Sequence, residues 1–185
     1  MIEITSEQVD RIHLLLGGIK DAPRKVIYNV LNRAVGTVKS TASKEIRKTY
    51  EIKHGDLTSN QNIKVVRAGP SKLEAAISFG GNLIPLVKFN VSPKQPRRKI
   101  VSASVTNGSG KTRLIHAYVA NLGKYGVGVF ERETSARESS KQLYGPAAAH
   151  MVENGEVLKN IQAAAMDTID KRIEHEISRI LNGYT

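Results

Sequence analysis

The sequence of 185 residues contains no cysteine and no tryptophan, and aromatic residues make up only 5% of it. The lack of cysteine excludes a disulfide framework, cysteine-ligated zinc and thiol catalysis, and it fits a reducing compartment. No apolar run approaches the roughly eighteen residues of a membrane span. The chain also starts with acidic groups and lacks the basic-then-apolar order of a signal peptide. We therefore expect a folded, soluble protein without a membrane partner.

Acidic residues are also scarce, because 17 of them stand against 28 lysines and arginines, which gives a net charge of +11. The excess lies in the middle of the chain. Residues 55–152 carry 14 basic and 5 acidic side chains, a net charge of +9, whereas residues 153–185 carry 4 basic and 6 acidic ones, a net charge of −2. An anionic partner, if there is one, is therefore expected to meet the middle segment.

The densest positive charge lies beside Pro93 and Pro96, which favour an extended loop over a helix. Six cations in this loop and in the hairpin that follows are candidates for contact with DNA: Lys94, Arg97, Arg98, Lys99, Lys111 and Arg113. Contact with a nucleic-acid backbone needs only point charges. A solvated loop that keeps the protein soluble explains the same pattern equally well. No aromatic residue is interleaved with the loop, which argues against stacking on single strands.

Helical periodicity marks both ends of the chain. Thr5 and Gln8 have the spacing of a capping box before a short helix that ends near Gly17. A long helix is predicted from Asp21 to about residue 50, with a basic face that includes Arg47. A second long amphipathic helix is predicted over residues 156–182.

Between these helices the period changes to short alternating runs separated by Gly, Pro, Asn and Ser. The predicted strands are residues 63–67, 73–79, 86–91, 100–106, 114–121 and 127–133. The sequence thus predicts a single α+β domain over residues 1–185, helical over 1–54, β-rich over 55–135 and helical again over 142–182. In this fold an antiparallel β-sheet meander packs against a long N-terminal helix and a long C-terminal helix.

Catalytic, cofactor and metal motifs are missing. Gly110-Lys111-Thr112 resembles the end of a phosphate-binding loop, but Val105 stands where that motif needs glycine, and the residues that follow alternate like a strand. The five histidines show no metal-ligand spacing, and no nucleophile motif occurs. We therefore expect no enzymatic activity, no cofactor and no metal.

Five short motifs occur in a particular order along the chain. They are Y-E-I-K at residues 50–53, I-P-L-V-K-F at 84–89, L-I-H-A-Y-V at 114–119, V-G-V-F-E-R at 127–132 and Q-L-Y-G-P at 142–146. In this order and spacing the chain resembles the minor tail protein Z family of tailed bacteriophages and prophages, from about residue 20 to 180.

The resemblance implies a structural virion protein that is assembled in the bacterial host cytoplasm and completes the tail at the end that joins the DNA-filled head. It also implies a homo-oligomeric ring, commonly sixfold, on the tail tube, next to terminator and head–tail connector proteins. The basic residues of the middle segment would then face genomic DNA that passes through the ring. Leu86, read as an exposed strand residue, and the turn at Tyr144 and Pro146 are candidate contacts to other subunits or to the tail.

Two other functions compete with this reading. A free basic nucleic-acid-binding protein of host or phage would use the same positive surface as its main activity. A nuclease or another phosphoryl-transfer enzyme ranks last, because no carboxylate or histidine constellation is present.

Overall fold

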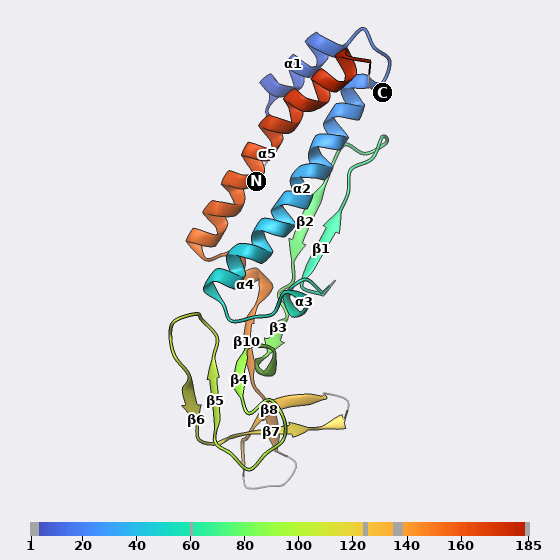
Figure 1. Ribbon diagram of the computed structural model, residues 1–185. Helices are drawn as coiled ribbons and strands as arrows, with labels where there is room; N and C mark the ends of the chain where they lie inside the picture. Colours follow the sequence, from blue (N-terminus) through green and yellow to red (C-terminus); the bar gives the residue numbers. More distant parts are fainter. Residues whose placement is uncertain (1–3, 60, 124–125, 135–138, 184–185) are drawn as a thin grey trace. The chain divides into compact units, whose positions relative to one another are not determined.

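The structure is a computed structural model that describes residues 4–59, 61–123, 126–134 and 139–183. It is an α+β fold with antiparallel sheets and two long helices, as the sequence predicts (Figure 1). The chain forms two compact units. The helical unit comprises residues 1–42, 64–78 and 155–185, and the strand-rich unit comprises residues 43–63 and 79–154. The prediction of a single domain over residues 1–185 stays a prediction.

Three helices build the helical unit: α1 (Ser6–Leu16), the first part of α2 (Ala22–Thr49) and α5 (Gly155–Leu181). The predicted capping box starts α1: the Gln8 backbone N–H donates to Thr5 Oγ1, and the Thr5 backbone N–H donates to the Gln8 side-chain oxygen Oε1. The three helices lie side by side (Figure 1). Their apolar stripes form one buried cluster: Ile12, Leu16, Ala22, Val26, Ile27, Val30, Ala34, Ile169, Ile173, Ile177 and Ile180. The two predicted long helices therefore pack together.

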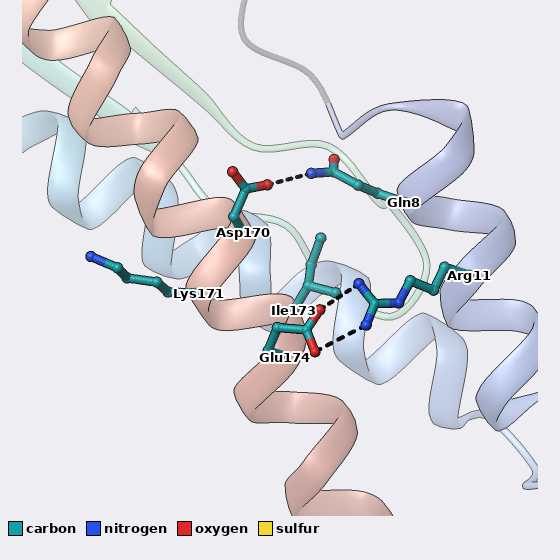
Figure 2. A pocket seen from close by; sticks show the side chains of 6 residues that line it. All are labelled: Gln8, Arg11, Asp170, Lys171, Ile173 and Glu174. Carbon is teal, nitrogen blue, oxygen red and sulfur yellow. Dashed lines mark hydrogen bonds and ion pairs between the residues drawn. The ribbon is translucent and has the colours of Figure 1, made fainter.

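Polar side chains of α1 and α5 contact each other between the two helices (Figure 2). Arg11 forms two contacts with the Glu174 carboxylate, at 2.6 and 3.2 Å, and Gln8 Nε2 donates to Asp170 Oδ1 at 2.6 Å. The side chains of Arg11 and Glu174 are each more than half exposed, so this ion pair contributes little to stability. The buried Ile12 and Leu16 therefore do most to hold α1 in place.

A buried carboxylate lies between α2 and α5 within the helical unit. The Glu176 side chain is 1% exposed and forms ion pairs with Arg172, at 2.7 Å, and with Arg179, at 2.9 Å. Asn29 of α2 also donates to Glu176, at 3.2 Å. A buried carboxylate is costly unless it is paired and hydrogen-bonded, and here two arginines and an amide compensate it.

A two-stranded sheet is formed by β1 (Ile63–Val66) and β2 (Ala76–Phe79). One side chain of α2 holds the loop that connects these two strands. The Asn32 amide donates to the Ala68 carbonyl oxygen at 3.0 Å, and its oxygen accepts from the Ala68 amide at 2.8 Å. A single asparagine thus satisfies both backbone groups of a buried residue.

The strand-rich unit begins with the end of α2 and with α3 (His54–Leu57). Three small antiparallel sheets follow. In the first, β3 (Leu83–Pro85) pairs with β10 (Tyr144–Ala147). The second contains β4 (Asn90–Ser92), β5 (Val101–Ser104) and β6 (Thr112–Leu114). The third contains β7 (Ala117–Asn121), β8 (Val127–Arg132) and β9 (Ser140–Gln142), and α4 (Ala148–Val152) follows β10.

The predicted strand over residues 86–91 is wrong in its first half. Residues Leu86–Lys88 form a 3₁₀ turn, η1, in which the Phe89 amide donates to the Leu86 carbonyl oxygen at 3.0 Å. This turn buries Leu86 and Phe89 together, at 7% and 1% exposure, whereas a flat strand would send them to opposite faces. Leu86 is therefore a core residue of its own unit and not an exposed strand residue.

Three of the sequence motifs meet in this unit. Tyr144 of β10 is opposite Pro85 of β3, and the Leu86 amide donates to the Leu143 carbonyl oxygen at 2.9 Å. The Leu143 amide in turn donates to the Val129 carbonyl oxygen of β8 at 2.8 Å. Segments that are far apart in the sequence are thus held together by backbone hydrogen bonds.

Candidate nucleic-acid interface

The sheet β4–β5–β6 carries the cations that the sequence singles out. Val91 pairs with Ala103, and Val101 pairs with Leu114, so the apolar side chains share one face. The opposite face is polar, because Arg113 pairs with Ser102, which also pairs with Ser92 on its other side. The sheet therefore separates a largely buried apolar face from a face with an exposed arginine.

The six predicted DNA-facing residues are all exposed; five lie at the two ends of this sheet, and Arg113 lies within β6. Residues 94–99 contain no helix or strand and connect β4 to β5 at one end, as the prolines predict. Lys111 follows the β5–β6 turn at the other end, beyond the pair Thr112 and Ala103. Within the described ranges none of the six forms an ion pair.

The β5–β6 turn contacts the C-terminal end of α2. Gly108 and Gly110 have φ values of 80° and 69°, which lie in the left-handed region that glycine adopts readily. The Asn107 side-chain amide donates to the Arg47 and Lys48 carbonyl oxygens at 3.0 and 2.7 Å. The Asn107 backbone N–H donates to the Thr49 carbonyl oxygen at 2.9 Å. The turn therefore satisfies carbonyl groups that the end of a helix leaves unpaired.

The segment after α2 is bound to the same turn. Tyr50 forms an antiparallel bridge with Thr106, and the Glu51 amide donates to the Val105 carbonyl oxygen at 2.8 Å. These bonds bring Arg47 and Lys53, which belong to the N-terminal third of the chain, next to the sheet that carries the basic loop.

A groove of about 360 Å³ lies at this junction, within the strand-rich unit. The groove is wide and open to solvent, so a hydrated, charged group can reach its lining residues. Its lining comes from α2, the segment after it, η1, β4 and two loops: Arg47, Tyr50, Glu51, Ile52, Lys53, Lys88, Phe89, Asn90, Lys94 and Asn107. We call this feature the basic groove.

The basic groove is positively charged, because four cations and one carboxylate line it, for a net charge of +3. Lys88 is compensated by Asp56, whose Oδ1 is 2.7 Å from Lys88 Nζ. Glu51 accepts from Ser104 Oγ at 3.1 Å. Arg47, Lys53 and Lys94 are exposed and form no ion pair with any residue that the structure describes.

Sequence reasoning identified one of these three cations as a site residue. Lys94 is among the predicted DNA-facing residues, whereas Arg47 was noted only as part of a basic helix face and Lys53 only as the end of a motif. The other predicted cations, Arg97 among them, do not line the groove. No local pattern links residue 53 to residue 94, because the link is the long-range pairing of residues 50 and 106.

The three residues predicted to contact other subunits or the tail differ in their exposure. Tyr144 is 44% exposed, and its hydroxyl donates to Gln142 Oε1 at 2.9 Å. Pro146 is half-buried. Leu86 is buried and therefore offers little surface to a neighbouring subunit.

One pair of side chains has the composition of a catalytic dyad. Ser43 Oγ lies 2.8 Å from His54 Nδ1, but Ser43 is 2% exposed and belongs to a helix, so a substrate does not reach its hydroxyl. Among the described residues no group of three or more His, Asp or Glu side chains is arranged to hold a metal ion. None of the helices in the described ranges has the length and apolar character needed to cross a bilayer.

Comparison with models of protein families places the chain in the class of structural proteins of bacteriophage tails. The matching family is described as Prophage minor tail protein Z (GPZ), and the match covers residues 16–185. The chain belongs to this family, which confirms the resemblance seen in its motifs. The comparisons found no match among curated proteins and none among solved structures.

Family membership assigns the protein a structural role in the phage tail, and therefore a place in the virion. The match begins at Leu16, the last residue of α1, so nearly all of α1 lies outside it. The strand-rich unit lies entirely within the match, including the basic groove and the three motifs that meet there.

Proposed function

We propose that the protein completes the phage tail at its head-proximal end. There it assembles with copies of itself as a ring, sixfold in the simplest case, on the tail tube. It helps join the tail to the head, next to terminator and connector proteins, while DNA passes through the ring. The observation that carries this proposal is the family match over residues 16–185, because a minor tail protein acts in an assembled tail.

The charge distribution supports a position next to DNA. The predicted loop and hairpin cations are exposed, and they have no ion-pair partners among the residues described. Positive charge that lines a channel attracts phosphate without reading sequence, and this attraction weakens as salt rises. In this arrangement the strand-rich unit faces the DNA, and the exposed Tyr144 is a contact to a neighbouring protein.

Electron microscopy of the purified protein, alone and mixed with tails, tests the assembly. We expect rings, and we expect them at the end of the tail that joins the head. A protein that stays monomeric and does not bind tails would contradict the proposal. A protein that binds free duplex DNA tightly and in a salt-sensitive manner, yet forms no rings and does not bind tails, would support the alternative of a free nucleic-acid-binding protein.

Neutralising the loop separates DNA contact from assembly. The variant combines four changes to glutamine, at Lys94, Arg97, Arg98 and Lys99, all of which are exposed. We expect tails to join heads normally, with an effect confined to the retention or passage of DNA. Loss of joining itself would show that the loop is a protein interface.

A further inference from the structure

The basic groove has cations on several sides that are available to a ligand. Arg47 belongs to α2, Lys53 follows that helix, and Lys94 follows β4. Arg47 Nε donates to the Ser43 carbonyl oxygen at 3.0 Å, which orients the guanidinium along its helix. Its two terminal nitrogens have no hydrogen-bond partner within the described part of the chain. Three separate segments thus present unpaired positive charge to one groove.

The other polar groups of the groove are of the types that contact phosphate oxygens. Tyr50 contributes a hydroxyl and Asn90 an amide, and neither side chain has a hydrogen-bond partner among the described residues. Hydroxyl, amide and cationic side chains together make most of the contacts that proteins form with nucleic-acid backbones. The one carboxylate, Glu51, is already engaged by Ser104.

The apolar residues of the groove are covered. Ile52 is 6% exposed and Phe89 is 1% exposed, so these two side chains offer little surface on which an aromatic or aliphatic side chain would anchor. Protein interfaces usually depend on such anchors at their centre. This difference favours a phosphate backbone over an acidic protein segment as the ligand.

We infer that the basic groove seats the phosphodiester backbone of duplex DNA, without sequence preference, and that Arg47, Lys53 and Lys94 are its phosphate contacts. The inference rests on the proposed function, in which DNA passes close to the assembled protein. It adds two residues, Arg47 and Lys53, to the predicted basic loop, and it gives the DNA a defined path on the strand-rich unit.

The test compares three double variants of the full chain that each remove two positive charges. The groove variant is Arg47→Gln/Lys53→Gln, the loop variant is Arg97→Gln/Arg98→Gln, and the control is Arg33→Gln/Lys64→Gln. All six side chains are exposed, and the control pair belongs to the helical unit. Circular dichroism verifies that each variant is folded.

Binding to a short duplex DNA of mixed sequence is measured from about 50 mM to about 200 mM salt, the range over which phosphate contacts weaken strongly. Each phosphate contact contributes about 0.9 to the slope of log K against log salt concentration. We expect the groove variant to reduce the slope by about 2 and the control by much less. The loop variant is expected to fall between them, because it removes charge near the groove without lining it.

Equal slopes in the groove and control variants would overturn the inference, because DNA would then respond only to net charge. Absence of duplex binding by the unmodified protein throughout this range would overturn it too. Unchanged DNA binding together with lost tail joining in the groove variant would show that the groove is a protein interface, which also overturns it. The proposed function is judged separately, by whether the same unmodified preparation forms rings on tails.

Discussion

Replacing Gly145 by alanine tests how the motif segments pack against each other. A Cβ atom at Gly145 would overlap the ring of Phe89, with Cζ only 2.8 Å and Cδ2 only 3.0 Å away. Phe89 is 1% exposed, so its ring cannot move aside into solvent. Overpacking of this kind costs about 1–3 kcal/mol. We therefore expect the paired strands β3 and β10 to open about 5 to 150 times more often.

Hydrogen exchange measured by mass spectrometry follows this opening locally, which matters because the chain forms two units and need not unfold in one step. Amides of β3 and β10 should exchange faster in Gly145→Ala, whereas those of α1 should not change. Gly155→Ala is the matched control, since a Cβ there meets no atom within 4 Å and the residue begins α5. It should stabilise the protein slightly, by less than about 1 kcal/mol.

A double-mutant cycle with Phe89→Leu isolates the contact. Removing the ring makes room for the new methyl group, so the double variant should lose at least about 1 kcal/mol less than the sum of the two single variants. Additive losses, or a Gly145→Ala variant as stable as Gly155→Ala, would refute this account of the packing.

Two further stability predictions concern the helical unit, and both are measured by hydrogen exchange of the amides of α1 and α5. Glu176→Ala should cost about 3–5 kcal/mol of stability, toward the lower end because the two arginines that it leaves unpaired are about one-third exposed. Arg11→Gln, which breaks the exposed ion pair with Glu174, should cost less than about 1 kcal/mol. Equal losses would show that the buried carboxylate does not hold the helices together. Ile12→Ala removes a fully buried side chain and should cost about 2–5 kcal/mol of stability. Leu14→Ala changes a side chain that is 85% exposed and should alter stability by less than about 0.5 kcal/mol. Similar losses in both variants would mean that α1 does not pack on the core as described.

The helices could be predicted from the sequence because their signals are local. The spacing of Thr5 and Gln8 marks the start of α1, and long apolar stripes mark α2 and α5 within a residue or two of their observed bounds. The family was likewise visible in short motifs whose order is a property of the chain itself.

The errors arose where tertiary packing decides the local structure. Residues 86–91 alternate like a strand, but the need to bury Leu86 and Phe89 on one side produces the turn η1. The sequence also does not show that the antiparallel strands form several small sheets, or that β10 returns from the end of the β-rich region to pair with β3. Local alternation gives no information about such a partner.

The basic groove could not be found from the sequence for the same reason. Clustered charge draws attention to residues 94–99, yet Arg47 and Lys53 lie about 40 to 50 residues earlier in otherwise ordinary helical and loop segments. They meet Lys94 only because Tyr50 pairs with Thr106 and Asn107 caps α2. A sequence shows how much charge a region carries, whereas the pairing of distant backbone segments decides which charges share a surface.

Cryo-electron microscopy of tails assembled with and without the protein tests the central claim most directly. We expect the protein to add a ring of density at the end of the tail that joins the head, with the strand-rich unit facing the channel. Tails that lack the protein should fail to join heads. Density along the tail tube or at the opposite end, or normal joining without the protein, would contradict a role in completing the head-proximal end of the tail.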